Sequence, residues 1–122
     1  LTQPDSKFNV ENEEEKLMRK VIQIIKKNAG NSNFSVKMLA KEVGVSRSYL
    51  YNKTLILFEK SPLKLITDIR LELGKELLEK SQLTISEIAF QTGFNNPKYF
   101  TQNFKKKYHK LPSKFRNETK KV

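Results

Sequence analysis

The sequence predicts an all-α protein of about seven helices, and two observations carry this prediction. Glycine and proline are rare, with four of each among 122 residues, which disfavours turn-rich β architectures. Apolar residues recur at intervals of three and four, and residues typical of helix N-caps precede most of these segments. No segment makes a convincing strand. We therefore expect helices packed around a modest core.

The start of the chain is predicted to contain one amphipathic helix. Residues 1–11 are polar and aperiodic, so we expect a flexible leader there. Asn12 is followed by three glutamates, which predicts a helix start because an N-cap and acids both suit the positive end of the helix dipole. The helix is expected to run to about Asn28, and a loop completes a segment covering residues 12–33.

Residues 34–60 are predicted to form two short helices separated by a tight turn. Ser35 is a suitable N-cap for the first and Ser46 for the second. Gly44 lies between them, where a sharp turn needs positive φ. The apolar positions expected to face the core in the second helix are Leu50, Leu57 and Phe58.

A long helix is predicted over residues 61–80. Ser61 and Pro62 form a start signal, an N-cap followed by proline at the first helical position. The helix should be about 30 Å long. Its expected apolar stripe is Leu63, Ile66, Ile69, Leu73 and Leu77, and its expected exposed acidic face is Asp68, Glu72, Glu76 and Glu79.

Three shorter helices complete the predicted chain over residues 81–116, before a basic tail at 117–122. Thr84 and Glu87 have the spacing of a capping box, and the helix they open is expected to end at Gly93. Asn95 is the expected N-cap of the next helix. The last helix is predicted to begin at Pro112 and to place Phe115 for packing.

Residues 35–44 and 84–93 repeat one another at an offset of 49. In each copy a cap residue, two aliphatic residues, an alanine and a final glycine coincide, and a capped polar-faced helix follows. The small alanine lets two helices approach closely, and the glycine permits the reversal between them. This is the pattern of a helix-turn-helix, and it occurs twice.

The net charge and the near absence of cysteine and histidine limit the functions that the sequence allows. The formal net charge is +11, and residues 95–122 alone carry nine basic side chains and one acidic one. This excess indicates an anionic partner. The chain has no cysteine and one histidine, so we predict no metal, no cofactor and no catalytic residue.

The paired units and their connecting helix resemble the AraC/XylS-type DNA-binding domain of bacterial transcription regulators. The resemblance covers residues 34–116, and three positions depart from it: Glu59 and His109 replace usual glycines, and Gly74 replaces a usual alanine. The residues that carry it are Leu39, Ala40, Val43, Gly44, Val45, Ser46, Arg47, Ser48, Tyr49, Leu50, Ser61, Pro62, Ile69, Arg70, Leu71, Glu87, Ile88, Ala89, Gly93, Phe94, Asn95, Tyr99, Phe100, Phe104, Lys105, Lys106, Pro112, Ser113, Lys114, Phe115 and Arg116.

The resemblance implies two helix-turn-helix subdomains joined by the long helix, with recognition helices at about residues 46–58 and 95–108. The matched segment is also similar to the output domains of hybrid two-component regulators. We therefore expect double-stranded promoter or operator DNA as the partner and an upstream receiver or sensor region in the same polypeptide. RNA polymerase is a further candidate partner. We expect a cytoplasmic domain without enzymatic activity, while a full-length hybrid protein could carry a histidine kinase and a membrane anchor.

In a helix-turn-helix the N-terminal part of the second helix meets base edges in the major groove. The side chains expected to read bases are Arg47, Ser48, Tyr51, Asn52, Asn96, Lys98, Tyr99 and Gln102. Those expected to contact phosphates are Ser46, Lys53, Asn95, Lys105, Lys106 and Lys107.

Two other readings stay open at this point. A nonspecific architectural or RNA-binding basic helical module would also be basic and helical, although the uncharged reading positions argue against binding by charge alone. A protein-interaction or enzymatic domain fits less well, because no catalytic constellation is present.

Overall fold

The computed structural model describes residues 12–120, so the expected leader at 1–11 and the end of the expected tail at 121–122 lie outside the described part. Within that part the chain forms seven α-helices and no strand, which confirms the predicted fold class. The helices are α2 (Glu13–Asn28), α3 (Val36–Val43), α4 (Arg47–Phe58), α5 (Pro62–Lys80), α6 (Ile85–Gln91), α7 (Pro97–Tyr108) and α8 (Pro112–Thr119).

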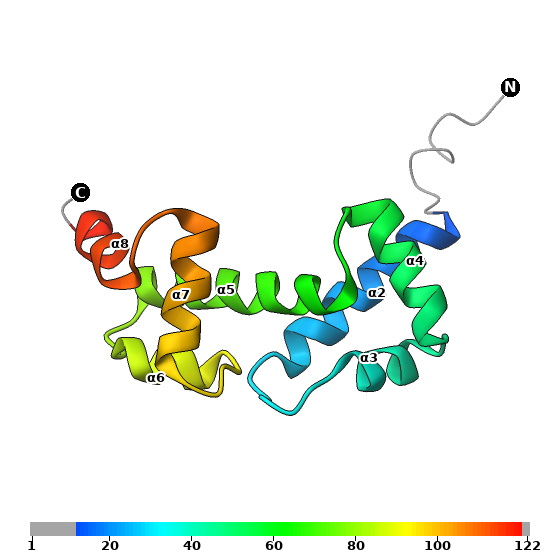
Figure 1. Ribbon diagram of the computed structural model, residues 1–122, viewed down its shortest axis with the longest axis horizontal. Helices are drawn as coiled ribbons and strands as arrows, with labels where there is room; N and C mark the ends of the chain where they lie inside the picture. The colour runs from blue at the N-terminus through cyan, green and yellow to red at the C-terminus, as the bar shows by residue number, and fades with distance from the viewer. Residues whose placement is uncertain (1–11, 121–122) are drawn as a thin grey trace, which may run out of the picture.

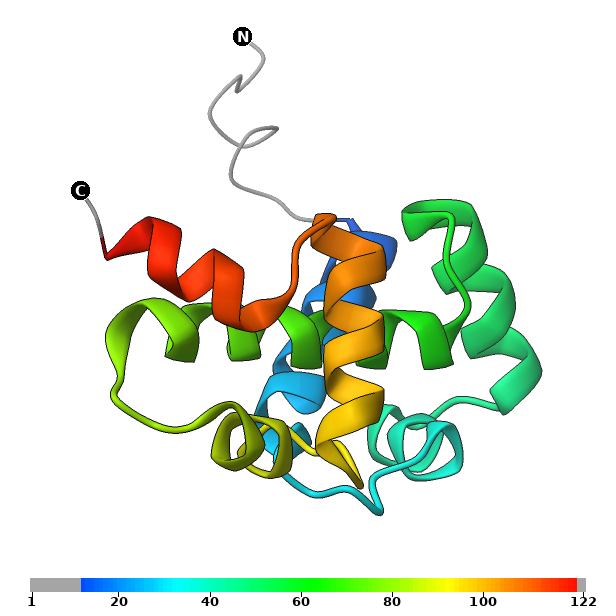
Figure 2. The same ribbon diagram turned by 60° about the vertical axis from the view of Figure 1, so that its left-hand side comes forward.

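Two groups of helices share α5 as their common element (Figure 1). The first unit, α2, α3 and α4, gathers at the N-terminal half of α5. The second unit, α6, α7 and α8, gathers at its C-terminal half. Figures 1 and 2 show α7 lying across α5 and α4 beside the N-terminal end of α5, with α4 and α7 running in the same general direction. The connecting helix therefore holds two helix-turn-helix units in one body.

Each unit has its own hydrophobic core, and α5 contributes to both. The first core is mostly aliphatic, and Leu65, Ile66 and Ile69 enter it from α5. Leu71 and Leu78 enter the second core from α5. Aromatic rings fill much of the second core. The ring of Phe94 lies 5.9 Å from that of Tyr99 and 5.2 Å from that of Phe100, and the ring of Phe104 lies 4.7 to 5.7 Å from those of Phe100, Tyr108 and Phe115.

The start signals read from the sequence form the expected caps. The side chains of Ser46 and Ser61 accept hydrogen bonds from backbone N–H groups three residues on. Thr84 and Glu87 form a complete capping box. Gly44 has φ of +88°, so the positive φ predicted for the first turn is confirmed. These local signals fix where the helices of both units begin.

The two non-glycine departures keep the left-handed turn that glycine usually provides. Glu59 ends α4 with φ of +59°, and His109 ends α7 with φ of +65°. Each donates its backbone N–H to a carbonyl of the preceding helix. Gly74 has a packing reason, because a Cβ there would lie 2.7 Å from the buried ring of Phe100.

Several predicted positions are wrong. Leu57 and Leu63 were expected in the core, but their exposed fractions are 41% and 62%. Thr54 is buried in α4, and α5 is buried on two faces, so a single apolar stripe does not describe it. Asn96, and not Asn95, is the N-cap of α7. The last helix continues to Thr119, so residues 117–119 are helical where a tail was expected.

Candidate nucleic-acid interface

The residues predicted to read bases in the first unit gather at the N-terminal half of α4. Arg47, Ser48, Tyr51 and Asn52 are all exposed and line one shallow hollow on the surface. Leu50 and Thr54 of the same helix are buried, which determines the side of α4 that faces the solvent. The hollow presents a guanidinium, a hydroxyl, a phenol and an amide, which are groups able to hydrogen-bond base edges.

The corresponding residues of the second unit are exposed at the start of α7. Asn96 uses its side-chain oxygen to accept a hydrogen bond from the Tyr99 backbone N–H at 2.7 Å, which leaves its amide protons available. Lys98 and Gln102 are exposed and four residues apart, so they share one face of the helix. Tyr99 is half exposed, and its ring packs 5.9 Å from that of Phe94.

The residues predicted to contact phosphate lie in two kinds of environment. Ser46 and Asn95 are exposed at the starts of the two recognition helices, and Lys105 and Lys106 are exposed near the end of α7. Lys53 and Lys107, which belong to the same predicted group, each have a carboxylate partner within the protein. Their charge is therefore partly neutralised.

Lys53 connects the first recognition helix to α2. Its Nζ lies 2.6 Å from Oε2 of Glu14, and 5.5 Å from the ring centroid of Tyr49. The hydrogen bond with Glu14 raises the pKa of Lys53 above its ordinary value. The acidic start of α2 was interpreted as a complement to the helix dipole, but it also supplies this ion pair beside the recognition helix.

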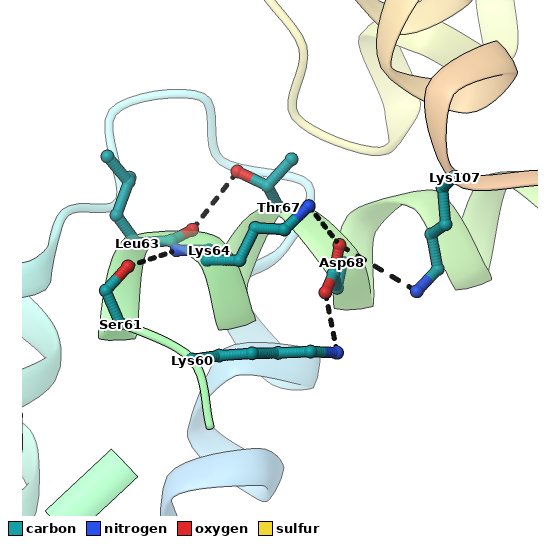
Figure 3. A network of polar contacts seen from close by, with 7 residues as sticks. All are labelled: Lys60, Ser61, Leu63, Lys64, Thr67, Asp68 and Lys107. Carbon is teal, nitrogen blue, oxygen red and sulfur yellow. Dashed lines mark hydrogen bonds and ion pairs between the residues drawn. The ribbon is translucent and has the colours of Figure 1, made fainter. Parts of the chain in front are cut away.

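Asp68 corrects a prediction, because it is buried and not part of an exposed acidic face. Figure 3 shows three lysines around its carboxylate: Lys60 at 2.7 Å, Lys64 at 3.2 Å and Lys107 at 3.8 Å. Burial alone would raise the pKa of Asp68, but the hydrogen bonds of Lys60 and Lys64 and the charge of Lys107 hold it below its ordinary value. In the sequence, the one sign of this ion cluster is the four-residue spacing of Lys64 and Asp68.

The lysine partners of Asp68 come from different parts of the fold. Lys60 follows the first recognition helix, Lys64 lies on α5 beside Asp68, and Lys107 comes from the second recognition helix. One carboxylate therefore forms ion pairs with lysines from the exit of α4 and from the C-terminal end of α7. Because three ammonium groups surround one carboxylate, this part of the surface stays positively charged.

Arg70 joins the two units, a role that sequence reasoning missed. It donates from Nε to the carbonyl of Ala29 at 3.1 Å and from Nη2 to that of Asn31 at 2.8 Å, which bonds α5 to the loop after α2. Burial lowers the pKa of its guanidinium. On the other side of this contact, a Cβ at Gly93 would lie 2.0 Å from the Ala29 carbonyl oxygen. The loop of the first unit thus packs on the turn of the second.

Arg116 has a related role inside the second unit. Its guanidinium donates to the carbonyls of Leu77 and Leu78 in the last turn of α5 and to those of Ser81 and Leu83 just after it. Leu77 also accepts from the Ser81 backbone N–H, so Arg116 adds donors where the helix runs out of its own, and a cation suits this end of the helix dipole. Arg70 and Arg116 are therefore structural, and neither adds to the exposed charge of the recognition helices.

Among residues 12–120, no three histidine or acidic side chains gather in a way that could hold a metal ion. No helix in this part is both long and apolar enough to cross a membrane.

The chain is similar to known regulators over most of its length. A family model described as a helix-turn-helix domain matches residues 39–118. The histidine kinase P4 of Formosa agariphila is 37% identical over 112 residues, which cover 92% of this chain and 8% of that protein. The C-terminal domain of AraT, a response regulator from Geobacillus stearothermophilus, is 30% identical, with a TM-score of 0.79 over 88% of both chains.

A transcriptional regulator with an AraC-type DNA-binding domain, from Chromobacterium violaceum, shares the fold at 21% identity, with a TM-score of 0.81 over 85% of this chain and 92% of that one. The fold, the paired exposed helices and these comparisons define a DNA-binding helix-turn-helix domain. The chain belongs to the AraC-type family, the DNA-binding domains of transcription regulators.

Proposed function

We propose that this domain binds double-stranded DNA in a sequence-specific manner, with α4 and α7 in two successive major grooves. The observation that carries the proposal is the arrangement of the two recognition helices, which run in the same general direction on one connecting helix. The 19 residues of α5 span roughly 28 Å, which is close to the ~34 Å between successive major-groove faces of DNA. Because α5 is somewhat shorter, we expect the DNA to bend toward the protein.

The exposed polar side chains divide into two roles in this proposal. Those at the starts of α4 and α7 read bases: Arg47, Ser48, Tyr51, Asn52, Asn96, Lys98, Tyr99 and Gln102. Ser46, Asn95, Lys105 and Lys106 contact phosphates, together with Lys53 and Lys107 once their internal ion pairs open. The base-reading group is mostly uncharged, which favours sequence discrimination over the nonspecific or RNA-binding alternative.

We propose further that the domain is the output part of a longer two-component regulator. Its similarity to a region covering 8% of a histidine kinase, and to the C-terminal domain of a response regulator, supports this placement. A receiver or sensor region would then precede α2 in the same polypeptide. We expect the domain to work in the cytoplasm, where the DNA is, with RNA polymerase as a further partner.

Selection of bound sites from random duplexes, followed by titration of the best site against a scrambled competitor, tests the proposal. We expect an affinity ratio of about 1,000 or more at physiological salt. Asn52→Ala and Lys98→Ala should each lose about 1–3 kcal/mol of discrimination at particular base pairs. Lys106→Ala should weaken all duplexes alike. Equal affinities for selected and scrambled DNA would support the nonspecific module in place of our proposal.

A further inference from the structure

A second hollow lies between the N-terminal end of α5 and α7. Ser61, the N-cap of α5, and three residues of that helix line one side of it, and three residues on one face of α7 line the other. The α5 residues are Leu63, Lys64 and Thr67, and the α7 residues are Tyr99, Asn103 and Lys106. The α7 residues are spaced four and three apart, so they form one stripe beside the face that carries Lys98 and Gln102.

The hollow is positively charged. Lys64 and Lys106 are both exposed, and they come from different helices. The nearest described carboxylate to Lys64, that of Asp68, is buried and shared with Lys60 and Lys107 (Figure 3). If Lys64 turned toward a ligand in the hollow, Asp68 would still have two ammonium partners. The structure therefore allows Lys64 to leave its internal ion pair without leaving a buried charge unpaired.

The neutral side chains add hydrogen-bonding groups. The Ser61 hydroxyl oxygen accepts from the Lys64 backbone N–H, so its own proton can be donated outward. Thr67 donates its hydroxyl proton to the Leu63 carbonyl, and Asn103 donates one amide proton to the Tyr99 carbonyl. The amide of Asn103 therefore retains a second donor. The lining holds two cations, several donors and one exposed apolar side chain, Leu63, and it contains no carboxylate, so it suits an anion.

We propose that this hollow binds a phosphodiester group of the DNA strand that crosses between the two major grooves. The inference rests on the proposed function, because a strand crosses here only if α4 and α7 occupy successive grooves. The ammonium groups of Lys64 and Lys106 suit a phosphate, which they contact without reading sequence. The connecting helix is then a third DNA contact, between the two reading helices.

The salt dependence of operator binding tests this assignment in the full chain. Lys64→Gln removes one charge from the hollow, and Lys80→Gln removes one exposed charge from the opposite end of α5 as a matched control. We expect Lys64→Gln to reduce the slope of log affinity against log salt by about one, and Lys80→Gln to leave it unchanged. Equal slopes for Lys64→Gln and the wild-type protein would overturn the proposal.

Neutralising single phosphates with methylphosphonate locates the contact on the DNA. One position between the two half-sites should weaken wild-type binding but have little further effect on Lys64→Gln. If every methylphosphonate position weakened both proteins equally, Lys64 would contact none of those phosphates. These outcomes are distinct from failure of the proposed function, in which the wild-type protein itself would show no preference for the selected operator.

Discussion

Gly44 and Gly93 occupy equivalent places in the internal repeat but have different surroundings. Both have a left-handed backbone, with φ of +88° and +91°. A Cβ at Gly44 would meet nothing within 4 Å. A Cβ at Gly93 would lie 2.0 Å from the Ala29 carbonyl oxygen and 2.6 Å from Nε of Arg70. The turn of the first unit is therefore open, whereas that of the second is packed against the first unit.

This difference shows that the two helix-turn-helix units are not interchangeable copies. The loop after α2, which belongs to the first unit, packs against the turn before α7 in the second unit. Arg70 lies beside this loop and this turn, and it hydrogen-bonds the loop to α5. The relative orientation of α4 and α7 thus depends on a contact that only one of the two turns makes.

The largest effect should come from placing alanine at each of these turns. Gly93→Ala adds the left-handed strain of an L-residue to an overlap with backbone, and should cost roughly 3 kcal/mol or more. Gly44→Ala should cost only the strain, about 1–2 kcal/mol. Urea unfolding of the two variants measures both values. Equal destabilisation would contradict the contact between the units.

Asp68 provides the next largest effect, because its lysines come from both units. Asp68→Asn should lower stability at pH 7 by about 2 kcal/mol, since three ammonium groups lose their common partner. The pKa of Asp68 is depressed in the folded state, so its contribution is present above the ordinary pKa near 4 and is lost as pH falls through the folded value. Unfolding from pH 7 to pH 2 should show the two proteins converging in acid. A difference that stayed constant with pH would contradict this ion cluster.

Glycine substitution at the C-terminal ends of the two recognition helices should have the same effect on stability. Glu59 and His109 both hold the left-handed conformation that glycine adopts without strain. Glu59→Gly and His109→Gly should each stabilise the protein by about 0.5 kcal/mol, because relief of strain exceeds the added freedom of the unfolded chain. Thermal unfolding of the two single variants and of the double variant measures this. Destabilisation by either glycine would show that the side chain it replaced contributes more than its backbone costs.

The smallest effect concerns the ion pair beside the first recognition helix. Glu14 forms an ion pair with Lys53 in the first unit, whereas no described acid is paired with the exposed Lys105 or Lys106 of the second unit. Glu14→Gln should release Lys53 and raise DNA affinity by about twofold at low salt, in line with an exposed ion pair of under 1 kcal/mol. Glu13→Gln, a change of the neighbouring acid, is the matched control. An equal gain for both variants would indicate general electrostatics in place of this pair.

Local signals predicted the fold well because each depends on only a few neighbouring residues. Ser46, Ser61 and Thr84 cap their helices through hydrogen bonds that span three residues, and the repeated glycine requires only its own φ. The exposed reading positions of α4 also follow locally, because Leu50 fixes which face is buried. The expectation for Asn95 failed by one residue, since Asn95 and Asn96 are equally good caps.

Features that depend on both units could not be predicted in the same way. A periodicity assigns one buried face to a helix, but α5 passes between two cores, so Leu63 proved exposed and Asp68 buried. Arg70 is 41 residues from Ala29 in the chain, and no spacing rule predicts which carbonyl a distant guanidinium will meet. The exposure of the candidate reading positions was thus predictable from local patterns, whereas the contacts that orient the two units were not.

A rigid domain that reads two neighbouring grooves requires a fixed distance between its half-sites, and a change in the spacing of the operator tests this requirement most directly. Inserting 5 or 10 base pairs between the half-sites of the selected operator should lower affinity by at least about 100-fold in both cases. The longer insertion returns the half-sites to one face of the duplex but places them beyond the reach of α5. Recovery of full affinity with the 10-base-pair insertion would contradict the account, because only flexibly joined units could follow it.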